Sequence, residues 1–280
     1  MTLRYVFRVL RRHRGACFAV AFLIVLTALA LLAPLFPVDP NALDLEHMME
    51  GPSSLHWFGT DELGRDYFIR SLYGARVSLF VGVLAMLTAL SLGVIVGLVS
   101  GYFGGWVDEV LMRLIDVLSS IPWIILVTVV GLFLKRGLSS IIIVIGIFGW
   151  MSIARLVRAE VLSLKEREYV QYAQFIHTPA LAILRRHLLP GVLPTIITSA
   201  TSGVAGAILT ESSLSFLGLG VQQPMSSLGS MLTQAQATLQ QAPYMAIIPG
   251  LIIFLTIYSF NKLGDVAKTL AWGSEEDNLD

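Results

Sequence analysis

EYVQYAQFIHTPALAILRRHLLPGVLP, residues 168–194, is a long polar stretch between two strongly apolar ones. It carries its own helix signals, because Thr178 is a good N-cap and Pro179 suits the first helical position, where a missing N–H costs nothing. Arg185 and the two basic residues after it would then fall in the last turn, where positive charge suits the helix dipole. With Pro190 beginning the next segment, the stretch is predicted to be a short helical hairpin held at a membrane face.

The composition indicates an integral membrane protein. The 280 residues are 55% hydrophobic and 14% charged, with a mean hydropathy of +0.76, whereas soluble domains carry about 25% charged residues. The formal net charge is zero, so no nucleic acid partner is indicated. We therefore expect an all-α fold in a lipid bilayer.

Six apolar runs are long enough to cross a bilayer of roughly 30 Å, which takes about 20 residues. The first follows several arginines, as a signal peptide does, but its length exceeds the roughly 7–15 residues of a signal core, so it is predicted to be a retained helix. The six predicted spans are 16–36, 77–100, 110–134, 139–160, 191–217 and 244–263.

The distribution of Lys and Arg sets the expected topology. With the N-terminus inside, thirteen of these residues fall in inner segments and five in outer ones. Both termini are therefore expected in the cytoplasm. The predicted organisation is an N-terminal segment 1–15, a transmembrane domain 16–263 with outer loop 37–76, cytoplasmic loop 161–190 and outer segment 218–243, and a solvated tail 264–280.

The outer segments have two predicted features. Thr60 is a candidate N-cap for an amphipathic helix on the outer interface, which would either fix the entry angle of the second span or dock an external partner. The uncharged stretch 221–243 is either a re-entrant gate element or a loop.

Small residues mark one face of the second span. Gly93, Gly97 and Gly101 recur every fourth residue, which places them on one helical face and allows close helix packing. Asp108, just beyond the next turn, is expected to cap the third span.

Charge within the spans is sparse, and an ionisable group at membrane depth is a functional hypothesis by default. Arg113 and Asp116, three residues apart, are expected to pair on one helix face. Glu211, with Ser215 one turn later, either lines the solute path or serves interface capping or packing.

No catalytic or metal-binding pattern is recognisable. The five histidines show no metal-ligand spacing on an expected helix, and there is no phosphate-binding loop of the G-x-x-x-x-G-K-[ST] type. The single Cys17 excludes an internal disulfide. We therefore expect no cofactor on this chain and no nucleotide hydrolysis by it.

The 168–194 stretch resembles the cytoplasmic signature of bacterial ATP-binding cassette (ABC) importer permeases, which reads E-A-A, three residues, Gly, nine residues, I-x-L-P. Gln171-Tyr172-Ala173 stands at the E-A-A, His177 at the glycine and His187-Leu188-Leu189-Pro190 at the end. The stretches HWFGTDELGRD…YGARVSL within 56–79, ESSLSFLGLG at 211–220 and FNKLGD at 260–265 resemble the dipeptide, oligopeptide and nickel branch, and within it the second, shorter-loop permease.

This resemblance implies the type I importer permease fold with six transmembrane helices in the bacterial inner membrane. It also implies a second homologous permease, two ATPase subunits that hold ATP and Mg, and an external solute-binding protein. The 161–190 loop would then couple to an ATPase, and His177 stands where the signature has glycine, the residue for which a left-handed turn costs least. The coupling residues carried over are Glu168, Gln171, Tyr172, Ala173, His177, Thr178, Pro179, Arg185 and Pro190.

The function indicated by the sequence is a permease subunit for di- or oligopeptides. A peptide needs a roomy, mostly uncharged cavity, because buried unpaired charge is costly. The alternatives are a nickel or metal-chelate importer permease and, from another class, a channel or scaffold without ATP coupling. A channel would show a repeated polar stripe along one span, and none is evident.

Overall fold

The computed structural model describes residues 14–134 and 137–276, which confirm the all-α prediction. Within them the only extended pairing is an isolated bridge between Thr60 and Asp66. The elements are α2 (Arg14–Leu32), η1 (Ala33–Leu35), α3 (Tyr67–Phe103), α4 (Gly105–Ser119), α5 (Trp123–Phe133), α6 (Leu138–Lys165), α7 (Glu168–Phe175), α8 (Ala180–Ile183), η2 (Leu184–Leu188), α9 (Leu189–Phe216), α10 (Leu228–Thr238) and α11 (Tyr244–Glu276).

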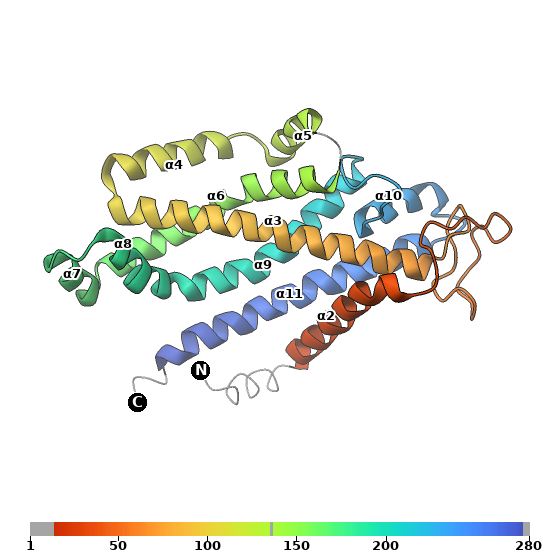
Figure 1. Ribbon diagram of the computed structural model, residues 1–280, viewed down its shortest axis with the longest axis horizontal. Helices are drawn as coiled ribbons and strands as arrows, with labels where there is room; N and C mark the ends of the chain where they lie inside the picture. Colours follow the sequence, from red (N-terminus) through yellow and green to blue (C-terminus); the bar gives the residue numbers. More distant parts are fainter. Residues whose placement is uncertain (1–13, 135–136, 277–280) are drawn as a thin grey trace.

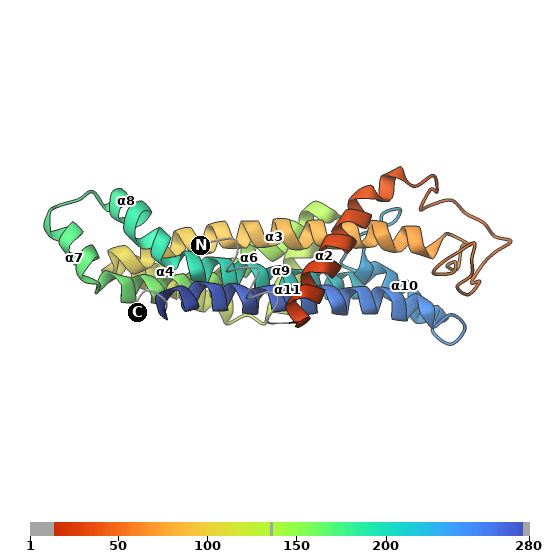
Figure 2. The ribbon, with the colours of Figure 1, turned by 90° about the horizontal axis from the view of Figure 1, so that it is seen from below.

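The long helices lie side by side along one axis. In Figure 1, α3, α6, α9 and α11 run lengthwise and α2 crosses toward the end where α10 and the 36–66 loop lie. The helices α7 and α8 lie at the opposite end, and Figure 2 shows that the bundle is thin in the second direction. The segments expected outside and the 161–190 loop are therefore at opposite ends of the molecule.

Five helices are long and apolar enough to cross a membrane, and the pair α4–α5 adds a sixth crossing if it counts as one span. The expectation that 110–134 is one continuous helix is wrong, because α4 and α5 meet at a bend of 84°. Pro122 explains the break, since it has no N–H to donate and the residue before a proline is pushed out of the helical region.

The outer helix expected after Thr60 is not a separate element, because α3 begins at Tyr67 and runs unbroken into the second span. Thr60 is not an N-cap. Its hydroxyl instead accepts from the N–H of Glu50 at 2.9 Å, and the loop stays irregular as far as Asp66. Gly64 has φ +73°, and a Cβ there would come 1.6 Å from the carbonyl oxygen of Asp44, so a helix cannot run through it. Asp66 caps α3 instead, by accepting from the N–H of Ile69 at 2.9 Å.

The three glycines of α3 face α6. A Cβ on Gly93, Gly97 or Gly101 would come within 2.7–2.8 Å of the side chains of Ile153, Val157 and Val161, respectively. The glycines therefore allow α3 and α6 to lie closer together than any larger residue would permit.

Helix α11 extends into the segment expected to be a solvated tail. Helix α11 runs without a break from Tyr244 to Glu276, so most of the 264–280 segment is helical. Residues 1–13 of the expected N-terminal segment, Lys135 and Arg136 of the topology count, and residues 277–280 lie outside the described residues.

Candidate functional site

The 161–190 loop folds against the bundle through two buried side chains of α7. Val170 and Ala173 pack in the main core cluster with Val161, Ile183 and Leu188. Because α7 spans only eight residues, this anchoring on one face fixes its orientation relative to α6 and α9. The opposite face of α7 is left free.

The turn after α7 is closed by His177 in the left-handed conformation, with φ of 56°. The N–H of Thr178 donates to the carbonyl of Ala173 at 3.0 Å, and the N–H of His177 donates to the carbonyl of Gln174 at 3.0 Å. These two bonds form a Schellman motif, in which glycine usually holds the position that His177 takes. The turn expected of the signature glycine therefore forms with histidine in its place.

An exposed apolar surface covers the end of this loop, and we call it the α7 face. Tyr172 is 65% exposed and Phe175 79%, far more than a large apolar side chain normally is in a packed structure. Their neighbours Tyr169, Ile176 and Leu181 are exposed as well. Several large exposed apolar side chains on one short loop indicate a protein–protein contact or a membrane contact.

Two details of the predicted hairpin are wrong. Helix α8 begins at Ala180, with Pro179 rather than Thr178 as its N-cap, and no side chain caps it. Arg185 and the next two residues do not end a helix, because they form the π-helical turn η2, which leads directly into α9. Pro190 explains the wider turn, since it cannot donate the bond that a regular helix would need there.

The remaining carried-over residues take varied positions. Glu168 is in the first turn of α7, and the side chain of Gln171 donates to the carbonyl of Glu166 at 3.3 Å. Arg185 and Pro190 are exposed. The structure thus brings the whole signature to one end of the bundle, while only Ala173 of the E-A-A positions points into the core.

Glu211 is completely buried, in a polar network that joins three helices. Its carboxylate accepts from the hydroxyl of Ser78 on α3 at 2.9 Å and from that of Ser215 at 2.7 Å. Ser78 accepts in turn from the N–H of Leu228 at 3.2 Å, at the start of α10. Both serine protons are therefore directed at Glu211, and the network fixes the N-terminus of α10 against α3 and α9.

The residues expected to line the solute path do not line the pocket described below. Glu211 and Ser215 lie inside the contact of α3, α9 and α10, which agrees with the packing alternative for Glu211. The uncharged segment 221–243 is more than a loop, because α10 begins with a capping box formed by Ser227 and Ser230. At eleven residues, α10 is too short to cross a bilayer.

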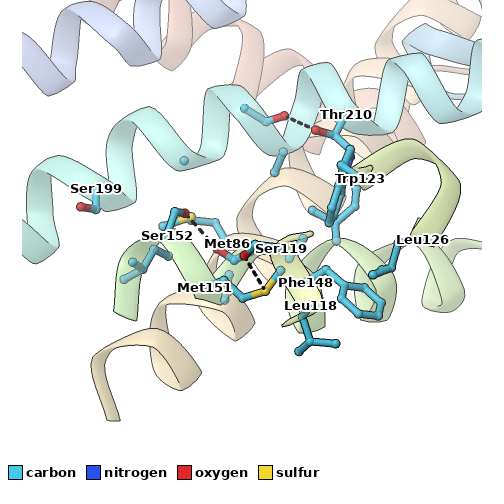
Figure 3. Close-up of a pocket in the computed structure, with 18 of the residues that line it drawn as sticks. Met86, Leu118, Ser119, Trp123, Leu126, Phe148, Met151, Ser152, Ser199 and Thr210 are labelled. Carbon is cyan, nitrogen blue, oxygen red and sulfur yellow. Dashed lines mark hydrogen bonds between the residues drawn. The ribbon is translucent and has the colours of Figure 1, made fainter. Parts of the chain in front are cut away.

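A pocket of about 600 Å³ lies between the α4–α5 bend and the bundle. Figure 3 shows its wall, built by Met86 of α3, by Ser119 and Trp123 beside the bend, by Phe148 of α6 and by Thr210 of α9. Of the lining residues that the structure describes, only Arg155 is titratable. A volume of this size with few polar groups is typical of small-molecule sites, which measure about 300–1,000 Å³.

The charged residues near this pocket are paired differently from the expectation. Asp116 contacts Arg155 of α6 at 2.8 Å, and in the described chain it makes no ion pair with Arg113. Asp108 is not the N-cap of α4, which is Gly104; it accepts two bonds of 2.5 Å from Arg158. Arg155 was missed as a site residue, although an arginine within an apolar run was a visible signal.

The 36–66 loop is held by charged groups that sequence reasoning left unassigned. Asp61 is fully buried and contacts the Nε atoms of Arg65 at 2.7 Å and Arg70 at 3.3 Å. At the exposed edge of the loop, the hydrogen bond between Asp44 and His47 lowers the pKa of Asp44 and raises that of His47. Among the described residues, no group of three or more His, Cys, Asp and Glu is arranged to hold a metal ion.

The sequence of this chain matches known family models and individual transport proteins. Residues 93–268 match the binding-protein-dependent transport system inner membrane component family, and residues 2–52 match the N-terminal TM domain of oligopeptide transport permease C. A glutathione transport system permease protein of Pectobacterium atrosepticum is 42% identical over 260 residues, 92% of this chain and 86% of its own length. A dipeptide transport system permease protein of Bacillus subtilis is 40% identical, over 92% of this chain and 81% of its own length. An oligopeptide transport system permease protein of the same species is 38% identical, over 91% of this chain and 84% of its own length.

Proposed function

The chain belongs to the binding-protein-dependent transport system inner membrane component family, and from this we propose that it forms half of the membrane path of an ATP-driven importer of di- or oligopeptides. It is a multi-pass inner-membrane permease subunit, and its relatives are transporter subunits rather than enzymes. Their names concern glutathione, oligopeptides and dipeptides, all of which are peptides. The largely uncharged pocket supports a cargo of this kind.

The proposed complex contains a second homologous permease, two ABC ATPases and an external binding protein. ATP and Mg are held by the ATPases. The proposed orientation places both termini and the 161–190 loop in the cytoplasm, as the excess of Lys and Arg in these segments supports. The position of α7 at the end opposite to α10 and the 36–66 loop is compatible with it.

The α7 face is the observation that carries the proposal. A short helix that is anchored by Val170 and Ala173 and exposes aromatic side chains is suited to transmit a push from a soluble partner to α6 and α9. Aromatic side chains of this kind dominate the energetics of protein–protein contacts. We therefore assign the α7 face to the contact with an ATPase subunit, in agreement with the signature that surrounds it.

A matched pair of phenylalanines tests this assignment. Phe175 on the α7 face is 79% exposed and Phe254 on α11 is 62% exposed. We expect Phe175→Ala to weaken ATPase binding about tenfold or more, because it removes a large exposed anchor, whereas Phe254→Ala binds as wild type. Ala173→Arg would be a poorer test, since Ala173 is only 5% exposed and the charge would disturb the fold itself.

The measurements are co-purification of the ATPase subunits and ATP-driven uptake of a labelled tripeptide, with the amount of inserted permease held equal. Loss of both with Phe175→Ala, and of neither with Phe254→Ala, is the expected result. If the double variant Phe175→Ala/Tyr172→Ala bound the ATPase subunits normally, the assignment would be overturned.

A further inference from the structure

The ion pair between Asp116 and Arg155 joins α4 to α6 and is only partly covered by the chain. Arg155 is ten residues before the end of α6, about 15 Å along the helix, and Asp116 is eleven residues into α4, about 16 Å. Their side chains are 47% and 59% exposed, respectively. Both residues lie within apolar runs predicted to span the membrane, 110–134 and 139–160, and charged groups in such segments face a bundle interior or a water-filled cavity rather than lipid. This pair therefore lies at the aqueous path or at a protein contact.

Both partners have unused hydrogen-bonding capacity. Arg155 uses only its Nη2 atom, which donates to Asp116 at 2.8 Å and to Ser119 at 3.4 Å. Within the described chain, its Nε and Nη1 atoms and the second carboxylate oxygen of Asp116 make no further hydrogen bond. A guanidinium edge and a carboxylate oxygen are thus open side by side. Arg155 lines the pocket, and Asp116, its partner, lies beside the pocket without lining it.

A second ion pair also holds α4 against α6. One end of that contact is already fixed by Asp108 and Arg158, which form two bonds of 2.5 Å and are 17% and 31% exposed. The bidentate, less exposed geometry is the stronger one. The single bond between Asp116 and Arg155 can open without releasing the helix.

We propose that Asp116 and Arg155 form a binding site for the charged ends of a zwitterionic peptide, which rests on the proposed function and names the feature of the cargo that is recognised. Arg155 takes the terminal carboxylate, for which its planar fork is the matching donor, and Asp116 takes the terminal ammonium. The apolar wall with Trp123, Phe148 and Met86 accepts the variable side chains without demanding a particular one.

The test uses the complete importer in proteoliposomes and three forms of one tripeptide: free at both ends, amidated at the C-terminus, and acetylated at the N-terminus. For each peptide, uptake by the variant is divided by uptake by wild type. Any preference of the external binding protein for one form of the peptide then cancels in this ratio. Arg155→Gln is expected to lower uptake of the free and acetylated forms about tenfold and to leave the amide unchanged, because only the carboxylate contact is lost. Asp116→Asn is expected to lower the free and amidated forms and to spare the acetylated one.

Arg113→Gln is the control, since Arg113 is an exposed arginine of α4 that does not line the pocket. An equal reduction of all three peptides by Arg155→Gln would overturn the proposal, because it would indicate a structural role. Absence of any ATP-driven uptake by wild type would instead contradict the proposed function.

Discussion

The contact of α3 with α6 and the bent pair α4–α5 are built on opposite principles. On α3, the glycines carry no Cβ where the helix faces α6, and side chains of α6 pack directly against the α3 backbone. On α4 and α5 few side chains are buried, Ile115, Leu126 and Val127 among them, while Trp106, Val117 and Phe133 are exposed. The same chain therefore combines a closely packed α3–α6 contact with an α4–α5 pair that is anchored by few side chains.

The difference locates where the molecule can move. Close-packed interfaces resist deformation, whereas regions with few buried contacts open at low free-energy cost. The pocket lies between the two regions, with α3 and α6 on one side and the α4–α5 bend on the other. A change in pocket size is therefore expected to come from α4–α5, relative to a fixed α3–α6 contact.

The largest effect is expected for Gly97→Leu. A Cβ at Gly97 would already come 2.7 Å from the carbonyl oxygen of Ala154 and from Val157, so the helices must separate. Overpacking of this kind costs about 1–3 kcal/mol or more. Thermal unfolding of the purified protein should show a lower Tm.

Gly131→Leu on α5 is the matched control, because no atom lies within 4 Å of a Cβ there. Its Tm is expected to stay at or above that of wild type, since leucine favours the helix more than glycine does. Equal losses for the two variants would remove the contrast between the two regions.

A smaller loss is expected for Glu211→Gln, at about 1–3 kcal/mol. The amide group cannot accept from both Ser78 and Ser215, whose protons both point to the carboxylate. Faster hydrogen exchange in α10 and a lower Tm would show it. Glu109→Gln, at an exposed site on α4, should change neither quantity, and a Glu211 variant that behaves the same way would argue against the network.

Pro122→Ala should change shape more than stability, by less than about 1 kcal/mol. Alanine restores an N–H donor at the break and favours a straighter α4–α5 pair. Spin-label distances between α5 and α6 should then shift, while distances between α3 and α6 stay constant. If the α3–α6 distances shifted together with the α5–α6 distances, the α3–α6 contact would not be independent of the α4–α5 pair.

The smallest effect is expected outside both regions, at Asp44 and His47. The raised pKa of His47 means that its contribution to loop stability is present below its usual value near 6.5 and is lost as the pH rises through the raised one. The lowered pKa of Asp44 means that the contribution of Asp44 to loop stability is lost as the pH falls through this lowered pKa. Limited proteolysis of the 36–66 loop should slow between these limits, and His47→Gln should abolish the dependence.

Hydropathy and local spacing determined much of this protein. The membrane class, the approximate span positions and the shared face of Gly93, Gly97 and Gly101 follow from composition and helical period, which are properties of neighbouring residues. The signature spacing also placed His177 at a turn, and the structure has it in the left-handed conformation.

Other features arise only when distant segments meet. Asp116 pairs with Arg155, 39 positions away, and Glu211 with Ser78, 133 positions away, so no local pattern could identify either partner. The start of α3 was missed because the buried Asp61 and its arginine partners hold the loop in a conformation that overrides local helix signals. Sequence thus determined which segments enter the membrane, because the transfer of apolar groups from water depends on each residue's own chemistry, while packing decided which polar groups meet, because that depends on the whole chain.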